Sequence, residues 1–204
     1  MTLTSDLVFT QLATSKAVDF GSLAASLDVS SESYLSQESE LRVAWFEYVA
    51  NGSARNVLTN RKAHLSQLTK GITPIEVNAY AGRLVQDTGD ASAPWGLRMI
   101  VAFNVPDTQK AEIDKWYVEE HIPLLMKSQY WLRARRYECE MVIGDTPFSS
   151  IAVHDLVDQR ALDSAERKVA RDTPWRASYS DSNWFKQAGR FYYCNNAKHI
   201  TEGA

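Results

Sequence analysis

The chain contains little cysteine and no long apolar segment, and both shortages limit what it can be. Only Cys139 and Cys194 occur among the 204 residues, without a CxxC pair or a Cys/His cluster, so we expect no metal site and no required disulfide. No apolar stretch approaches the roughly 20 residues that span a bilayer, and residues 1–6 lack the features of a signal peptide. We therefore expect a soluble, cytoplasmic protein without a membrane partner.

Excess basic charge and glycine-rich nucleotide motifs are also missing. The formal net charge is −3, which argues against a nucleic-acid partner. Arg133, Arg135 and Arg136 form the densest basic group, but on a strand the first two point one way and the third points the other. The sequence has no G-x-G-x-x-G, no G-x-x-x-x-G-K-[ST] and no G-x-S-x-G pattern. We therefore predict a protein that works without a cofactor.

Apolar residues are present in sufficient number for a core. The composition is 45% hydrophobic and 23% charged, as in ordinary globular proteins. Runs of β-branched and aromatic residues predict strands at 6–12, 41–49, 75–85, 97–104, 131–141, 151–156 and 189–194, with a weaker one at 32–37. Helical spacing of apolar residues predicts helices at 56–68, 108–126 and 161–171.

The order of these elements indicates two units. Residues 86–94 are polar and rich in turn formers, as in a boundary between units. After them the order is strand, helix, strand, strand, helix, strand, the ferredoxin-like βαββαβ arrangement. Ala-Gly-Arg at 81–83 recurs at 188–190, and further matches at a similar offset indicate a repeat. We predict an α+β fold of two tandem ferredoxin-like repeats, 1–88 and 95–197, forming an intramolecular α/β barrel.

The first repeat is predicted to be degenerate. The stretch from Val8 to Ala44 is shorter than the corresponding stretch from Ile100 to Ala152, and the missing part corresponds to the long helix of the second repeat. Any chemistry that depends on this helix can therefore occur only once in each chain.

The segment Trp116–Leu124, with the sequence WYVEEHIPL, is the most unusual in the chain. Tyr117 and His121 are four residues apart and share a helix face, with Trp116 and Glu120 on the adjacent ridge. An imidazole beside a phenol can abstract a proton and return it elsewhere. His121 is the candidate acid/base, and Tyr117 the candidate donor to a developing oxyanion. The alternative is a structural histidine hydrogen-bonded to the backbone at the end of a helix.

This segment, with WLRARRY at 131–137, ALDS at 161–164 and TPWR at 173–176, resembles the dimeric α/β barrel superfamily, and more narrowly its two-repeat, EthD-like proteins. The resemblance covers residues 95–195, and the first half lacks the WYxxEH motif. It implies a cavity between the sheet and its helices. Relatives include cofactor-free monooxygenases, polyketide cyclases, muconolactone isomerases and decarboxylases, so the resemblance leaves the reaction open.

Several further residues are candidates for the wall of this cavity. The strand at 97–104 would form the floor with either Met99, Val101 and Phe103 or the alternate set, and the sequence does not decide between them. Arg176 could anchor an anionic substrate or be a surface ion-pair partner. His154 is expected to be a satisfied sheet histidine, since Asp155 points to the opposite face. The predicted substrate-contacting residues are Trp116, Glu120, Phe103, Trp131, Trp175 and Arg176.

These observations predict a cofactor-free enzyme of the lyase, isomerase or cyclase type. Its substrate would be a small apolar or aromatic molecule, polyketide-like compounds included, bound against aromatic walls. One alternative is a cofactor-free monooxygenase of the same fold. The other is a small-molecule-binding protein without catalytic activity, in which His121 is structural. Further assembly into a homodimer is compatible with either reading.

Overall fold

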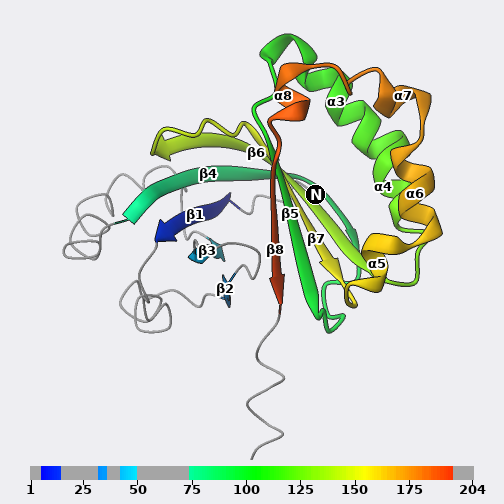
Figure 1. Cartoon of the computed structure of the whole chain (residues 1–204), viewed down its shortest axis with the longest axis horizontal. Helices are drawn as coiled ribbons and strands as arrows, with labels where there is room; N and C mark the ends of the chain where they lie inside the picture. Colours follow the sequence, from blue (N-terminus) through cyan, green and yellow to red (C-terminus); the bar gives the residue numbers. More distant parts are fainter. Residues whose placement is uncertain (1–5, 15–31, 36–41, 50–73, 195–204) are drawn as a thin grey trace, which may run out of the picture. The chain divides into compact units, whose positions relative to one another are not determined.

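The computed structural model describes residues 6–14, 32–35, 42–49 and 74–194, with side chains over 78–141 and 144–193. The described chain is α+β and forms two compact units. One contains residues 1–84 and 138–149, and the other 85–137 and 150–204 (Figure 1). The predicted helix at 56–68 lies outside the described residues. In the part of the chain that is described, no helix is both long and apolar enough to span a bilayer.

The first unit is built on antiparallel strands. β1 (Asp6–Thr14) pairs with β3 (Arg42–Val49) and with β4 (Pro74–Gly89), and β2 (Glu32–Leu35) pairs with β3. Residues 138–149 contact β4 through Asn78, whose side-chain oxygen accepts bonds from the backbone N–H groups of Asp145 and Thr146 at 3.1 and 3.3 Å. The hydroxyl of Tyr80 donates to the carbonyl of Thr146 at 2.6 Å.

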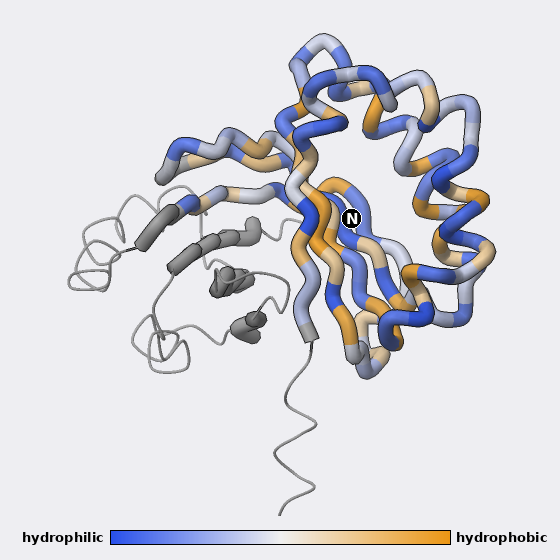
Figure 2. The backbone as a smooth tube through the Cα atoms, viewed as in Figure 1, coloured by the Kyte–Doolittle hydropathy of each residue, from blue (hydrophilic) through white to orange (hydrophobic). Residues whose placement is uncertain are grey.

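The second unit has the predicted βαββαβ order. Its strands lie in the order β6 (Trp131–Ile143), β7 (Ser150–Leu156), β5 (Leu97–Phe103) and β8 (Gly189–Cys194). β5 lies between β7 and β8 and is antiparallel to both. The helices lie together on one side of this sheet (Figure 1). β5 is almost wholly buried, in keeping with the apolar residues along it in Figure 2.

The polar segment predicted as a linker is partly strand. β4 continues to Gly89, because Arg133 of β6 holds Asp87 with two bonds of 2.8 and 2.6 Å and Asp90 donates its N–H to the carbonyl of Leu132 at 3.1 Å. Gly89 has a φ of 109°, and a Cβ there would lie 2.2 Å from the Leu132 oxygen. Only glycine fits this close approach.

The long predicted helix at 108–126 is composite. It comprises η1 (Asp107–Gln109), α3 (Lys110–Trp116), η2 (Tyr117–His121) and α4 (Ile122–Leu125), and η2 is a π-helical turn. Pro123 explains the irregularity, because proline lacks an N–H and its ring clashes with the carbonyl four residues earlier. π turns of this kind often occur at functional sites.

The predicted helix at 161–171 is two helices, α5 (Arg160–Asp163) and α6 (Ala165–Arg171). Ser164 breaks it with an extended backbone, ψ 150°, and its side chain caps α6 by accepting a bond from the N–H of Arg167. Two short helices were not predicted, α7 (Pro174–Ala177) and α8 (Asn183–Lys186). Thr173 caps α7 in the same way through the N–H of Arg176, so serine or threonine starts both segments.

Candidate active site

The second unit contains a cavity of about 220 Å³ between its sheet and helices. Met99, Val101 and Phe103 of β5 line it. This decides which of the two alternate sets of strand residues faces the cavity, a question that the sequence left open. Met99 lies directly opposite His154 of β7 and Tyr192 of β8, and these two side chains also line the cavity. The floor is therefore a row of side chains that crosses three strands.

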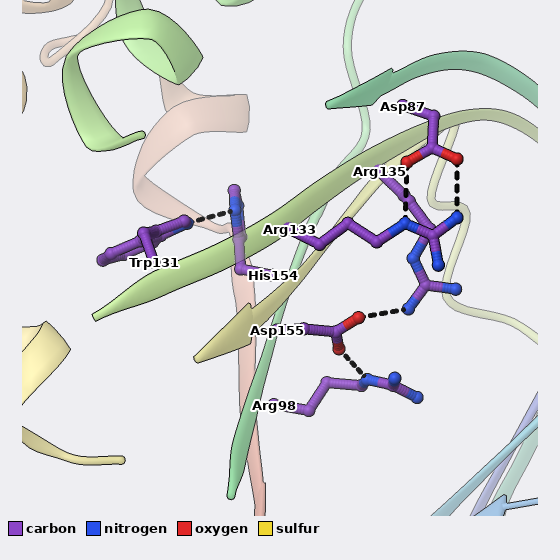
Figure 3. A network of polar contacts seen from close by, with 7 residues as sticks. All are labelled: Asp87, Arg98, Trp131, Arg133, Arg135, His154 and Asp155. Carbon is purple, nitrogen blue, oxygen red and sulfur yellow. Dashed lines mark hydrogen bonds and ion pairs between the residues drawn. The ribbon is translucent and has the colours of Figure 1, made fainter. Parts of the chain in front are cut away.

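The opposite face of the sheet carries a buried charged network (Figure 3). Asp155 forms ion pairs with Arg98 of β5 and, at 3.1 Å, with Arg135 of β6. All three side chains are buried. His154 and Asp155 are neighbours on β7 but point to opposite faces (Figure 3), as the sequence predicted, so the pair is no catalytic dyad.

His121 lies at the end of η2 and lines the cavity. Its ring stacks on Trp116, with centroids 4.4 Å apart, and meets the ring of Tyr117 edge-on at 5.4 Å. Nδ1 lies 3.3 Å from the carbonyl oxygen of Ala170 on α6. Because a carbonyl oxygen can only accept, we assign the ring proton to Nδ1, which leaves Nε2 with a free lone pair.

The protonation state of His121 follows from its surroundings. Burial lowers the pKa of its imidazole to about 4, and the charges of Arg176, Arg136 and Arg167 act in the same direction, against the hydrogen bond to Ala170. His121 is therefore neutral at pH 7. Within the described residues its Nε2 makes no hydrogen bond, so a lone pair is available to a molecule in the cavity.

Tyr117 presents a neutral hydroxyl to the same space. The residue is buried, and burial raises the pKa of its phenol to about 12. The guanidinium of Arg136 lies over the ring, 4.1 Å from its centroid, and is itself ion-paired with Asp114 at 2.5 Å. Among the described residues the Tyr117 hydroxyl has no hydrogen-bond partner. It can therefore act as a donor to a bound molecule.

His154 is buried and hydrogen-bonded, as predicted, and it also lines the cavity, which was not foreseen. The indole Nε1 of Trp131 donates to its Nδ1 at 3.1 Å. Since an indole N–H can only donate, Nδ1 of His154 is bare and Nε2 carries the proton. Burial lowers the pKa of His154 to about 3, and the second-largest cause is the positive charge that His121 gains at acidic pH. The two histidines thus hold opposite tautomers.

The predicted substrate-contacting residues separate into two groups. Phe103, Trp116, Trp131 and Arg176 line the cavity together with His121 and Tyr117. Glu120 and Trp175 do not line it, and their polar atoms bond to other residues. Glu120 accepts bonds from the indole of Trp116 at 3.0 Å and from the hydroxyl of Thr173 at 2.6 Å. Trp175 donates to Glu112 at 3.0 Å and to the Tyr179 hydroxyl at 2.8 Å.

Three further arginines at the cavity were not anticipated: Arg167 and Arg171 of α6, and Arg190 of β8. The spacing of Arg167 and Arg171, four residues apart on a predicted helix, was a readable signal that they share a face. Nothing in the sequence places Arg190 beside them.

Across the described part of the chain, no cluster of three or more His, Cys, Asp or Glu residues could hold a metal ion.

No protein-family model and no curated protein sequence matches the chain. Solved structures match it over almost its whole length. The crystal structure of an anthrone oxidase-like protein has a TM-score of 0.65 and 9% identity, with 95% of this chain and 93% of that chain covered. A ferredoxin-fold protein of Listeria monocytogenes related to antibiotic biosynthesis monooxygenases has a TM-score of 0.55 and 9% identity, with 94% of each chain covered.

A heme-degrading enzyme, also of Listeria monocytogenes, has a TM-score of 0.51 and 8% identity, with 92% of this chain and 98% of that chain covered. At these identities the likeness establishes the fold and leaves the chemistry to the site itself. The chain thus has an α+β fold whose structural neighbours are ferredoxin-like proteins of the monooxygenase-related kind.

Proposed function

We propose that this protein is a cofactor-free enzyme that removes a proton from a small apolar or aromatic molecule, with His121 as the base. The observation that carries the proposal is the bare Nε2 of a neutral imidazole at a cavity that Tyr117 also lines. A general base must be unprotonated and within reach of its proton. His121 meets the first condition at any pH well above 4.

A base with so low a pKa needs help, because the imidazolium that forms is a stronger acid than an ordinary histidine and readily returns the proton. Two groups supply it by stabilising the negative charge left on the substrate. If the proton leaves a carbon beside a carbonyl, or the hydroxyl of a phenol, the resulting oxyanion accepts bonds from the Tyr117 hydroxyl and the Nε2–H of His154. The anion also raises the pKa of His121 once it has formed. Phe103 and Trp116 supply apolar walls.

The fate of the carbanion decides the reaction type. Return of the proton to another atom gives an isomerase, and attack on a second carbonyl of the same molecule gives a cyclase. The second candidate is monooxygenation. There the carbanion of a CH₂ group adds O₂, the peroxide takes a proton, and loss of water leaves a ketone. Two structural neighbours, an anthrone oxidase-like protein and a relative of antibiotic biosynthesis monooxygenases, favour this second candidate.

The polar groups of the cavity count against a purely structural role for His121. A binding protein without activity would be favoured by a cavity in which His121 is the only polar group. Here Tyr117, His154 and several arginines line the same space. Buried polar groups without partners are costly, so their presence at a cavity fits a site that supplies those partners through its ligand.

We also propose the finer organisation that the sequence predicts. It consists of two tandem ferredoxin-like repeats, at 1–88 and 95–197, with a degenerate first repeat and an intramolecular barrel of the EthD-like kind. The recurring Ala-Gly-Arg supports it, as does the agreement with single chains of similar length. A cytoplasmic location and a homodimer remain predictions.

Anthrone, with its acidic CH₂ group, tests the proposed chemistry and separates its branches. Without oxygen, in D₂O, the enzyme should speed deuterium uptake at that carbon, followed by NMR. In air, oxygen uptake in step with ketone formation identifies a monooxygenase, and its absence identifies an isomerase or cyclase. Repeating both assays with phenols and 1,3-diketones covers smaller substrates. If no compound that binds shows faster exchange, the base role of His121 is wrong.

A further inference from the structure

Four arginines gather at the cavity, and their guanidinium groups form no ion pair with an acidic side chain among the described residues. Arg167, Arg171, Arg176 and Arg190 all line it, whereas none of the described residues that line it is aspartate or glutamate. They come from three elements, α6, α7 and β8. Each arginine carries a positive charge under all physiological conditions, so this part of the wall has four positive charges and no negative one.

The other arginines of this unit behave differently. Arg98 and Arg135 pair with Asp155, Arg133 with Asp87, Arg136 with Asp114, and Arg160 with Asp158. By contrast, within the described chain the four cavity arginines form no ion pair. In this unit, the arginines away from the cavity all form ion pairs. The four arginines at the cavity do not, so their charges are available to a bound anion.

The hydrogen bonds of the cluster engage only a few of its guanidinium N–H donors. Arg176 donates one N–H to the carbonyl of Arg171 at 3.0 Å, and Arg190 donates one to the carbonyl of Ala188 at 3.3 Å. Arg167 donates one to the carbonyl of Leu162. A guanidinium has five N–H donors in a fixed fork. Most of these donors are therefore available to a ligand, and three of the four side chains are held by one bond each.

The cluster adjoins the apolar wall of the cavity. The guanidinium of Arg176 lies over the ring of Phe185, 5.2 Å from its centroid, and both side chains line the cavity. Like charges so close repel one another. Burial and then the charges of Arg171 and Arg190 lower the pKa of Arg176, and burial and Arg171 lower that of Arg167. An anion bound among them removes this repulsion.

We infer that the substrate carries a carboxylate, which Arg176 and Arg190 bind with help from Arg167 and Arg171, while its apolar body lies against Phe103, Trp116 and Phe185. The guanidinium fork matches a planar carboxylate with two parallel bonds. The volume of about 220 Å³ is below the roughly 300–1,000 Å³ of sites for drug-sized ligands. An aromatic or other compact carboxylic acid meets both conditions.

The inference builds on the proposed function, since it names the class of molecule on which His121 would act. It can be tested without turnover. Calorimetric titration of the full chain would compare three probes with the same ring system: 2-naphthoate, 2-naphthalenemethanol and 2-naphthyl phosphate. The carboxylate should bind at least tenfold more tightly than the alcohol, and added salt should reduce this preference because exposed charges are screened.

Arg176→Gln and Arg190→Gln test the assignment of residues, and Arg160→Gln is the matched control, since Arg160 pairs with the exposed Asp158. A hydrogen bond to a charged group is worth enough to change Kd about 10- to 100-fold. Each cavity variant should weaken naphthoate binding by about that factor and leave the alcohol unaffected. Arg160→Gln should leave the binding of both unchanged. Arg190 is exposed on its strand, so that variant keeps the test open if Arg176→Gln unfolds.

Several outcomes would overturn the inference. Equal affinities for carboxylate and alcohol, unchanged naphthoate binding in both arginine variants, or no binding of any probe would refute the anion site. If 2-naphthyl phosphate binds tenfold more tightly than 2-naphthoate, the site recognises a phosphate and the inferred carboxylate is wrong. His121→Gln separates this inference from the proposed function: it should keep naphthoate binding while losing proton exchange. If exchange survives in that variant and the arginine effects hold, only the proposed function fails.

Discussion

The indole N–H of Trp131 donates to Nδ1 of His154 at 3.1 Å, across 23 residues of sequence. This bond decides which nitrogen of the buried imidazole carries the proton, and hence whether His154 offers a donor or an acceptor to the cavity. His121 is held in the opposite tautomer by the carbonyl of Ala170. One histidine can therefore accept a proton while the other donates a hydrogen bond.

Trp131→Phe should release the tautomer of His154 and leave the fold in place, because the apolar ring is kept. Long-range ¹H–¹⁵N spectra should show the Nε2–H tautomer in the parent protein and a mixture in the variant. Loss of one neutral hydrogen bond, worth about 1 kcal/mol, should lower turnover up to about tenfold. An Nδ1–H tautomer of His154 in the parent protein would contradict the assignment.

The pH profile of activity should have an unusual acidic limb. His121 is a base only when neutral, and its pKa is about 4. The kcat/KM of the free enzyme should therefore stay level as pH falls through 6.5 and decline only near pH 4, provided that circular dichroism shows folded protein there. A limb centred near 6.5, the ordinary value for histidine, would mean that the imidazole is solvated.

The same pKa shifts should make stability depend on pH. Between the ordinary value of 6.5 and the folded values of about 4 and 3 for His121 and His154, the unfolded chain binds protons that the folded chain does not. The free energy of unfolding should therefore fall as pH falls below 6.5 and stop responding to these groups below the folded values. Urea unfolding at several pH values measures it.

The control for this stability test is the double variant His121→Gln/His154→Gln. Its loss of stability between pH 6.5 and 4 should be clearly smaller than that of the parent protein, since only other groups still titrate. Equal slopes for the two proteins would show that the histidines are not held neutral by burial.

Asp155→Asn should be strongly destabilising, because it leaves Arg98 and Arg135 charged and buried without their carboxylate. Breaking a buried ion pair in this way costs about 3–5 kcal/mol. The matched control is Asp158→Asn, which removes the exposed pair with Arg160 and should cost at most about 1 kcal/mol. Similar midpoints of urea unfolding for the two variants would contradict this difference.

The strands of the second unit were predictable because each is a local run of β-branched and aromatic residues. The run predicted at 189–194 coincides with β8 (Gly189–Cys194), and that at 97–104 is one residue longer than β5 (Leu97–Phe103). The contact between Tyr117 and His121 was also predictable, because four-residue spacing survives the π turn. In each case the signal lies within a few neighbouring residues.

The remaining features depend on contacts that are distant in sequence. The break at Ser164 lacks a glycine or proline signal and arises where α5 ends and the serine caps α6. His154 could be assigned to a sheet, but its place at the cavity depends on its pairing with Met99 of another strand. The arginine cluster forms only because α6, α7 and β8 meet. No pattern along the chain reports such a meeting.

His121→Gln, assayed for proton exchange and thermal stability on the same preparation, tests the account most directly. Glutamine keeps a donor for the carbonyl of Ala170 but cannot take up a proton at neutral pH. The melting temperature should change little, while exchange per folded molecule should fall by about 10²–10⁴, and Tyr117→Phe should cost less. A lowered melting temperature with unchanged exchange per folded molecule would show that His121 is structural and contradict the account.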